Sequence, residues 1–493
     1  MKVLLVYPNI SASMTPQIGL LSLGSYLIKS GIEIKICDLT FSPLWKYANT
    51  LHLEIENWKP DVIAISCRTM GYPVSLELCK MVKSKHPNRL LIAGGPHMTF
   101  RPEDLVGIVD YGVIGEGEGP LLDLTTALAN GRRRDIQEIP NIIFQRNGEV
   151  IQNPLRPLLD LSTLPMPMWS LFDERHYLQH FLLNDKPDAK ICGSFEGSRG
   201  CPFTCSYCSN ETLKSMYRGK GKWRREKPAS TIRKEILEFK SQYGLDLIYF
   251  VDEVVMTTDK RTSEIRENLH DLKVPFVFME RPEFINEKRV IDMRQAGAYS
   301  CSIGVESGNE TLRKERLRRS MSDEEIYESF HLMKDHGIQT HTFTMFGMPG
   351  ETKEMMKMTY ELLKNIQPDS AQATTFYPLP GTSLEKYCKK HNYFTERTFA
   401  TSYYSKSYLK FDADIKLSIE RYCNLINIGT WRSTLKMKII EYLGLRSILF
   451  IRLMFNIKIV YDSILLRGFA GTIRKVINKI KFQSITLSNE KTI

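Results

Sequence analysis

Short apolar runs alternate with amphipathic stretches through roughly the first 130 residues. Runs such as 2–7 and 90–95 are almost continuous in Val, Ile and Leu and are bounded by Gly or Pro, which is typical of strands buried on both faces of a sheet. Segments with helical periodicity, such as 19–31 and 75–87, lie between the runs. Helical connections between buried strands imply parallel pairing. The pattern therefore predicts a doubly wound, Rossmann-like α/β domain over residues 1–140.

A hairpin and a linker follow this domain. Two alternating segments flank Asn147-Gly148, a dipeptide that tolerates the positive φ angles of a two-residue turn. A Pro-rich passage over 154–167 then indicates an extended connection. The sequence thus predicts a hairpin and Pro-rich linker over 141–188.

Strands and helices alternate again from 189 to 400. Six or seven β/α units fit into this stretch, too few for a complete eightfold barrel. We therefore expect a partial (β/α)6 barrel of the TIM type, with ligands at the C-terminal ends of its strands. Beyond residue 400 the strand signal fades, and 401–493 is expected to form a basic helical extension.

Composition supports a folded protein and says little about chemistry. Of 493 residues, 42% are hydrophobic and 25% charged, which excludes a disordered or fibrous chain. The apolar run at the N-terminus lacks the length and the small-residue cleavage site of a signal peptide, so we expect a cytoplasmic protein.

Charge is concentrated near the C-terminal end. The net charge is +11, and 431–482 contains eleven Lys and Arg against two acidic residues. No uncharged run there reaches the ~18 residues of a membrane-spanning helix. The interleaved cations and apolar residues fit either an interfacial helix on anionic lipid headgroups, peripheral to the membrane, or a helical cap with a solvated basic face. Sparse aromatic platforms disfavour nucleic-acid binding.

Three of the ten cysteines lie within eight residues, at Cys201, Cys205 and Cys208. In a reducing compartment this spacing favours metal binding over disulfides. Thiolates select iron–sulfur clusters or zinc, and a closed site of either kind would use a fourth ligand. Three thiolates leave one metal position open for chemistry. The other cysteines are expected to be small buried hydrophobic residues.

The spacing CxxxCxxC, with an aromatic residue before the last Cys, resembles the signature of the radical S-adenosylmethionine (SAM) superfamily. The resemblance covers roughly residues 190–385. It implies a [4Fe-4S] cluster on Cys201, Cys205 and Cys208, whose open iron binds the amino and carboxylate groups of SAM. It also implies reductive cleavage of SAM to a 5′-deoxyadenosyl radical. A structural zinc knuckle is the alternative interpretation of the three cysteines.

Further segments match the superfamily at the ends of predicted strands. The resemblance places an aromatic residue near adenine, one carboxylate near the SAM amino group and another near the ribose or the amino acid moiety of SAM. It also places glycines where the backbone approaches adenosine. Each glycine-rich strand end, taken alone, is also typical of an ordinary β/α turn. The candidate SAM-binding residues are Tyr207, Asp252, Glu253, Gly304, Glu306, Gly347 and Gly350.

The N-terminal α/β domain resembles that of the cobalamin-binding class of these enzymes. Its matching segments end predicted parallel strands, where open α/β sheets take their ligands. The Asp-x-His-x-x-Gly motif, which supplies an axial imidazole in other cobalamin proteins, is missing after the first strand, and His97 is not expected to replace it. A module that binds no corrin remains the alternative. The candidate cobalamin-binding residues are Ser66, Gly94, Gly95, Gly115 and Glu116.

The combined resemblance implies a cobalamin-dependent radical SAM enzyme, most often a methyltransferase acting on an unactivated carbon. Alternatives are a radical cyclase or rearrangement enzyme of the same architecture, a methylthiotransferase, and a non-catalytic corrinoid or iron–sulfur sensor. The spacing of Cys37, Cys67 and Cys79 does not match the second cluster site of a methylthiotransferase.

The expected partners are a small-molecule substrate and a reductant such as flavodoxin or ferredoxin. Membrane contact by the basic C-terminal region would favour an apolar or lipid substrate.

Overall fold

The computed structural model describes residues 1–11, 13–178, 188–394, 402–404 and 406–461. These residues form two compact units. The first unit contains Met1–Tyr177 and Thr212–Arg225, and the second contains the described residues of Leu178–Glu211 and those from Glu226 to 461.

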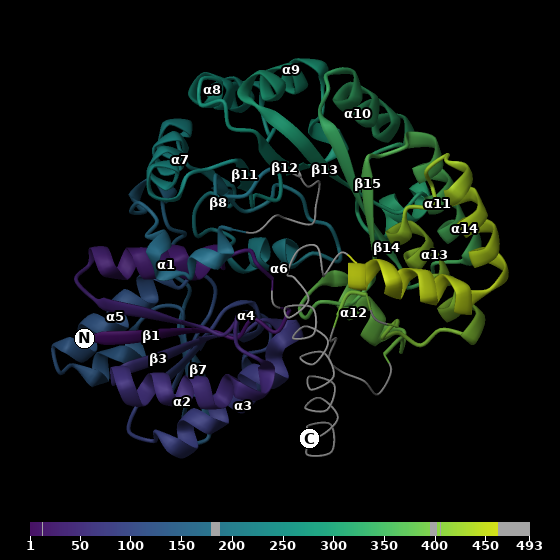
Figure 1. Ribbon diagram of the computed structural model, residues 1–493. Helices are drawn as coiled ribbons and strands as arrows, with labels where there is room; N and C mark the ends of the chain where they lie inside the picture. The colour runs from purple at the N-terminus through teal and green to yellow at the C-terminus, as the bar shows by residue number, and fades with distance from the viewer. Residues whose placement is uncertain (12, 179–187, 395–401, 405, 462–493) are drawn as a thin grey trace. The chain divides into compact units, whose positions relative to one another are not determined.

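The first unit is built on a seven-stranded sheet of order β2-β1-β3-β4-β5-β6-β7 (Figure 1). Strands β1 to β5 pair in parallel, and β6 and β7 are antiparallel. The strand order reverses between β1 and β3, as in doubly wound folds. The strands are β1 (Lys2–Tyr7), β2 (Glu33–Asp38), β3 (Val62–Ser66), β4 (Leu90–Gly94), β5 (Tyr111–Val113), β6 (Ile142–Arg146) and β7 (Glu149–Gln152).

Helices connect the parallel strands of this sheet, as the apolar pattern predicted. Every residue of β3 is buried, which explains its uninterrupted apolar run. The sequence analysis did not name the helices that follow β4 and β5. The helices are α1 (Ile18–Lys29), α2 (Tyr47–Trp58), α3 (Tyr72–Lys85), α4 (Pro96–Phe100) and α5 (Glu118–Ala129).

The predicted hairpin is confirmed at Asn147-Gly148. Both residues have positive φ, 50° and 85°, and Arg146 pairs with Glu149 across the turn. Because β6 also pairs with β5, the hairpin continues the sheet of the first unit.

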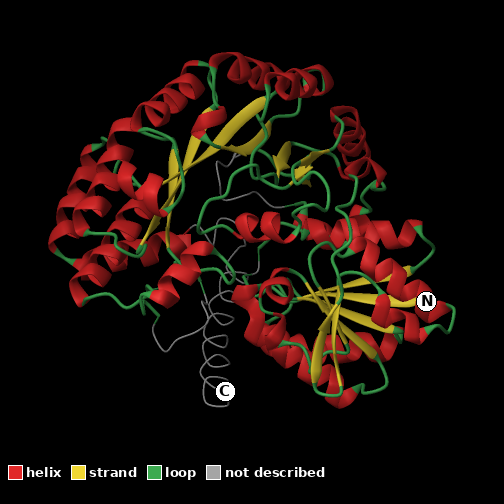
Figure 2. Ribbon diagram, turned by 180° about the vertical axis from the view of Figure 1, so that it is seen from behind, coloured by secondary structure: helices red, strands yellow, loops and turns green. Residues whose placement is uncertain are grey.

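The second unit contains a six-stranded parallel sheet of order β15-β14-β13-β12-β11-β8, which confirms the predicted partial barrel. Figure 2 shows helices along one face of this curved sheet. Its strands are β8 (Cys192–Phe195), β11 (Leu247–Phe250), β12 (Phe276–Glu280), β13 (Ala298–Glu306), β14 (Gln339–Phe346) and β15 (Ser370–Thr375). Two short strands, β9 (Ser198–Arg199) and β10 (Arg225–Glu226), also pair.

Several of the helices in this unit begin at a residue whose side chain caps the helix. Ser322 and Glu325 form a reciprocal capping box before α10, and Thr258 caps α8. Gly297 ends α9 in the left-handed conformation that a non-glycine residue rarely adopts. The helices are α6 (Ser209–Met216), α7 (Ala229–Tyr243), α8 (Asp259–Leu269), α9 (Glu287–Ala296), α10 (Asp323–Asp335), α11 (Lys353–Ile366) and α12 (Ser383–Lys390).

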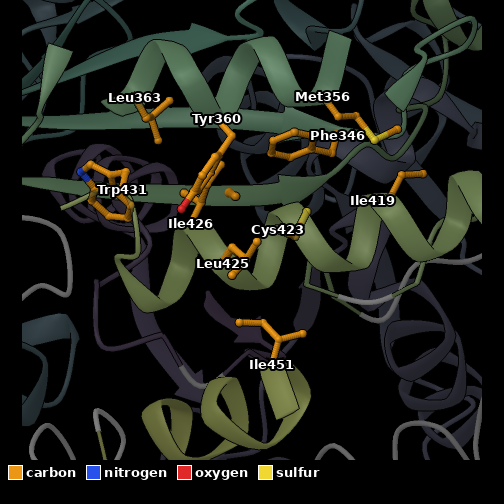
Figure 3. Packing of buried hydrophobic residues seen from close by; sticks show 11 residues of the cluster. Phe346, Met356, Tyr360, Leu363, Ile419, Cys423, Leu425, Ile426, Trp431 and Ile451 are labelled. Carbon is orange, nitrogen blue, oxygen red and sulfur yellow. The ribbon is translucent and has the colours of Figure 1, made fainter. Parts of the chain in front are cut away.

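The predicted helical extension is present as far as it is described. It comprises α13 (Ala413–Ile428), α14 (Leu435–Arg446) and a further helical stretch at 448–461, and the remainder of the predicted region, 462–493, lies outside the described residues. Side chains of α13, such as Ile419 and Leu425, pack with Tyr360 of α11 and with Ile451 in one buried cluster (Figure 3).

Across the described part of the chain, no helix combines the length and the apolar character needed to cross a bilayer.

Candidate active site

The three clustered cysteines lie on the loop between β9 and α6. Cys201 and Cys205 are buried and Cys208 is half-buried. Burial raises the pKa of the Cys201 thiol to about 11, and the negative charges of Glu253 and the other two sulfurs add to the rise. Burial likewise raises the pKa of Cys208. Three thiolates in this loop therefore need a cation among them to be stable.

Two arginines direct N–H groups at the sulfur of Cys205. Arg281 Nη1 donates at 2.9 Å, and Arg319 Nη1 lies 3.9 Å from the same atom. Arg281 is buried, is paired with Glu283, and lies 3.6 Å from the centroid of the Phe203 ring. Neither arginine belongs to a motif that the sequence predicted for the site. Arg281 directly follows β12, so its place at a strand end was the signal that could have found it.

Tyr207, Glu306 and Arg319 form one polar group, in which Arg319 is buried and the other two are half-buried. Tyr207 Oη donates to Glu306 Oε1 at 3.0 Å, and Arg319 Nη1 donates to Tyr207 Oη at 3.1 Å. Burial opposes the charge of Arg319, but its anionic neighbours raise the pKa of the guanidinium above its ordinary value. The structure thus brings together two residues that the sequence placed a hundred positions apart.

Gly304 borders this group. Arg319 also donates to the carbonyl oxygen of Gly304. A Cβ atom at Gly304 would lie 3.1 Å from Glu306 Oε1 and 3.3 Å from Arg319 Nη2. Glu306 itself has a φ of 67°, an uncommon left-handed conformation for a non-glycine residue, at a register shift between β13 and β14. The backbone at the end of β13 therefore lies close to the charged groups of Glu306 and Arg319.

Asp252 and Glu253, adjacent in sequence, lie in different environments. Asp252 is buried and accepts from the Gly197 amide at 2.8 Å and from the hydroxyl of Ser198, the first residue of β9. Glu253 is exposed, and its Oε1 accepts from Asn210 Nδ2 at 3.2 Å. Since Asn210 Nδ2 is also 3.7 Å from the sulfur of Cys208, Glu253 is the carboxylate on the side of the cysteine loop.

The loop after β14 carries Gly347 and Gly350, which have φ angles of 83° and 86°. Glu351 closes this loop, because its Oε2 accepts from the amides of Gly347 at 2.6 Å and Met348 at 3.2 Å. Its Oε1 is buried with no hydrogen-bond partner among the described residues. Burial raises the pKa of Glu351 to about 8, although the two amides oppose the rise. Glu351 was not among the residues that the sequence predicted for the site.

In the first unit, the candidate cobalamin residues follow three neighbouring strands. Ser66 ends β3 and pairs with Gly94 at the end of β4. Gly95 has a φ of 92°, and a Cβ there would lie 2.9 Å from the carbonyl oxygen of Cys67. Gly115, after β5, has a φ of 77°, and a Cβ there would lie 2.0 Å from the hydroxyl of Tyr217. Both positions therefore require glycine for packing within the unit.

Glu116 pairs with a side chain of its own unit. Arg225 donates to its two carboxylate oxygens at 2.7 and 3.1 Å, and the Leu159 amide donates at 3.2 Å. The amide of Glu116 donates to Tyr217 Oη at 3.1 Å. These contacts attach segment Thr212–Arg225 to the end of β5.

His97 is buried and engaged by neighbouring side chains. Its Nε2 lies 3.0 Å from Asp104 Oδ2, and its ring stacks on Tyr72 with centroids 4.2 Å apart. The other ring nitrogen, Nδ1, is buried without a hydrogen-bond partner in the described part of the chain.

Two family models match the chain. The model for the radical SAM superfamily matches residues 195–363, and the model for the B12 binding domain matches residues 10–125. The first match contains the cysteine loop, and the second contains the strand ends that carry Ser66, Gly94, Gly95 and Gly115.

Sequence similarity to known proteins covers most of the chain. An uncharacterized methyltransferase, PH0819 of Pyrococcus horikoshii, is 29% identical over 80% of this chain and 84% of its own length. The anaerobic magnesium-protoporphyrin IX monomethyl ester cyclase of Rubrivivax gelatinosus is 25% identical over 78% of this chain and 69% of its own length.

A solved structure shares the fold. The radical SAM methyltransferase TsrM of Kitasatospora setae, with cobalamin and a [4Fe-4S] cluster bound, superimposes with a TM-score of 0.66. Its sequence is 19% identical, and the match covers 85% of this chain and 84% of TsrM. The predicted fold class and both predicted domain types are confirmed. The chain thus joins a B12-binding domain to a domain of the radical SAM superfamily.

Proposed function

We propose that this protein is a cobalamin-dependent radical SAM methyltransferase that acts on an unactivated carbon of a small-molecule substrate. The observation that carries the proposal is a loop of three cysteines next to the hydrogen-bonded Tyr207–Glu306–Arg319 group, in a chain that also has a B12-binding domain. The methyltransferase among its relatives supports the choice of reaction.

Cys201, Cys205 and Cys208 fit a [4Fe-4S] cluster as its three protein ligands. Cys205 and Cys208 receive N–H groups from Arg281, Arg319 and Asn210, and none of these donors can ligate iron. The donor set is therefore three thiolates, which leaves one iron for SAM. When bound, the cluster and the corrinoid would supply the electron that cleaves SAM and the carrier of the methyl group.

The chain's own residues would then orient SAM. We assign Glu253 to the SAM amino group, because a carboxylate pairs with an ammonium and Glu253 lies on the cysteine side of the strand end. Asp252 is assigned a positioning role through its bonds to the amide of Gly197 and the hydroxyl of Ser198. Tyr207 would contact adenine and Glu306 the ribose.

Three glycines complete the assignment of the SAM site. Gly304, Gly347 and Gly350 would allow the backbone to approach the adenosine closely. Glu351 holds the loop of Gly347 and Gly350 in shape through its bonds to two backbone amides.

The corrinoid would occupy the C-terminal ends of β3, β4 and β5. Ser66, Gly94, Gly95 and Gly115 lie there on neighbouring strands, and open α/β sheets bind ligands at this edge. Glu116 is assigned a positioning role, since its carboxylate is paired with Arg225. With His97 buried against Asp104, we propose that the corrinoid has no imidazole ligand from this domain.

A radical cyclase is the second candidate, favoured by the relative from Rubrivivax gelatinosus. The two reactions differ in what they do with SAM. Methyl transfer converts one SAM to S-adenosylhomocysteine, whereas cyclisation initiated by a radical yields 5′-deoxyadenosine without it.

Anaerobic purification with added hydroxocobalamin tests the cofactors, and incubation with SAM carrying a deuterated methyl group tests the reaction. Iron, sulfide and bound corrinoid, with S-adenosylhomocysteine formed and label recovered with the corrinoid fraction, would support the proposal. Deoxyadenosine without S-adenosylhomocysteine would favour the cyclase. Zinc in place of iron and sulfide would overturn both.

The remaining partners belong to the same proposal. A one-electron donor such as flavodoxin or ferredoxin would reduce the cluster. The basic C-terminal region would bring the protein into peripheral contact with a membrane, where an apolar or lipid substrate could be met.

A further inference from the structure

The helices of the C-terminal extension already have a buried face. Ile440 and Gly444 of α14 and Ile451 of the next helical stretch are buried. A Cβ at Gly444 would lie 3.0 Å from side-chain atoms of both Leu425 and Ile451, so the helices pack closely at this point. Figure 3 shows Ile451 directed toward Leu425 of α13. Packing against the core of the second unit therefore accounts for the apolar residues on one side of each helix.

A second apolar face points to solvent. On α14, Leu435, Ile439, Tyr442 and Leu443 are 75, 51, 52 and 39% exposed, at spacings that put them on one side of the helix. On the next helical stretch, Leu449, Leu453 and Ile457 are 72, 57 and 53% exposed at four-residue intervals. We call these seven residues the apolar stripe.

The exposed apolar residues of the stripe are ordered along each helix and not scattered, because they recur at three- and four-residue intervals. A helix that only covers a core needs apolar residues on one side, with polar residues elsewhere. Here two consecutive helices each carry a second, exposed row of apolar residues. Exposed apolar rows of this kind mark an interaction site.

The charges along the stripe are mostly positive. Between 435 and 461 the chain has five cations, Lys436, Lys438, Arg446, Arg452 and Lys458, and a single acidic residue, Glu441. Arg452 is paired with Glu420 of α13. Glu441 is mostly buried, and its carboxylate is paired with Lys364 at 2.6 Å. Arg446 lies 4.1 Å from the ring centroid of Tyr442, so an aromatic ring of the stripe carries a cation beside it.

We propose that the apolar stripe binds the surface of an anionic lipid bilayer, with its leucines and isoleucines in the headgroup boundary and the flanking cations at the lipid phosphates. A bilayer fits both the exposed apolar stripe and the cations beside it. An interfacial helix combines an apolar face with Lys and Arg that reach acidic headgroups. Neither helix spans the membrane, since both are attached to the core through Ile440, Gly444 and Ile451.

Vesicle flotation with the full-length protein tests this inference. We expect binding to phosphatidylcholine vesicles with about one third phosphatidylglycerol to be at least about tenfold tighter than to pure phosphatidylcholine. The triple variant L449E/L453E/I457E should lose this binding. Leu237→Glu on α7, at a leucine that is 42% exposed, is the matched control and should bind as the unsubstituted protein does.

One further variant, compared with the triple variant, separates the possible occupants of the stripe. A chain ending at Tyr461 should retain binding to the anionic vesicles. Loss of binding in that chain, with retention in the triple variant, would assign binding to residues 462–493 and overturn the proposal. A dimer that the triple variant dissociates, with no vesicle binding by the unsubstituted protein, would assign the stripe to a second copy and overturn it as well.

Folding and cofactor loading are followed in the same samples. Circular dichroism and iron content of the triple variant should match those of the unsubstituted protein, because the substituted side chains are exposed. Vesicle binding does not depend on the reaction, so a failed methyl-transfer assay leaves this test intact.

Discussion

In the first unit, the candidate residues at the strand ends are mostly glycines, whereas in the second unit charged side chains surround the cysteine loop. Gly95 and Gly115 have positive φ, and a side chain at either would collide with atoms of the same unit. Around Cys205, Arg281 and Arg319 direct N–H groups at a sulfur. Gly95 and Gly115 follow parallel strands of the first sheet, and Arg281 follows β12 of the second. Close backbone packing distinguishes the first set, whereas charge distinguishes the second.

The difference predicts opposite sensitivities to substitution. A site built from backbone tolerates no added volume, because the neighbouring atoms leave no room for it. A site built from ligands and charges tolerates modest changes of volume but not the loss of a donor. The following predictions test this contrast, from the largest expected effect to the smallest.

Removal of a cluster ligand should have the largest effect. In Cys205→Ala, we expect iron and sulfide to fall to background after anaerobic reconstitution, because two thiolates cannot hold the cluster. The matched control is Cys301→Ala, at a fully buried cysteine within β13. It should keep its iron, and full iron in Cys205→Ala would refute the assignment.

An added methyl group at Gly115 should cost about 3 kcal/mol of stability in the first unit, from left-handed strain together with the collision with Tyr217. Gly131→Ala is the control, because Gly131 has a φ of 68° with no atom within 4 Å of the added Cβ. It should cost only about 1 kcal/mol. Thermal melts of Gly115→Ala and Gly131→Ala measure the difference.

Combining Gly115→Ala with Tyr217→Phe sharpens this comparison. The hydroxyl is the atom nearest to the added Cβ, so its removal should restore part of the lost melting temperature. Equal melting temperatures for the two glycine variants would show that the Tyr217 contact does not matter.

Glu351 should make stability depend on pH. Its pKa is raised from 4.5 to about 8, so the folded state holds a proton that the unfolded state has released. Stability of the unsubstituted protein should therefore fall as pH rises from about 4.5 to about 8, by up to about 1.4 kcal/mol per pH unit.

Glu351→Gln should flatten this dependence, because the amide stays neutral and its oxygen can still accept from Gly347 and Met348. Glu324→Gln, at an exposed position of α10, should leave it unchanged. Melting temperatures measured across this pH range compare the three proteins, and parallel profiles for all three would contradict the prediction.

Loss of one N–H donor at Cys205 should have the smallest effect. Arg281→Met keeps most of the volume but removes a positive charge and a hydrogen bond at a cluster ligand. We expect the midpoint potential of the cluster to fall by roughly tens of millivolts, with iron content unchanged. Redox titration followed by electron paramagnetic resonance measures the shift, and an unchanged potential would limit Arg281 to a packing role.

The local pattern of the sequence was sufficient for most of the secondary structure. Continuous apolar runs identified the buried strands, and Asn147-Gly148 identified the hairpin, because these signals arise from a residue and its immediate neighbours. The cysteine spacing likewise indicated the cluster loop. The hairpin's place at the edge of the first sheet was not evident, because pairing of β6 with β5 is a long-range contact.

Tertiary structure decided how the candidate residues are used. Asp252 and Glu253 are adjacent in sequence, and only the folded chain shows that one bonds Gly197 and the other lies beside the cysteine loop. Arg281 and Arg319 carry no local motif. They reach Cys205 only in the folded chain, Arg281 from the end of β12 and Arg319 from the segment before α10. Residue type and spacing therefore determined which chemistry the chain can support, whereas distance, burial and partner, which depend on contacts between remote segments, determined the role open to each side chain.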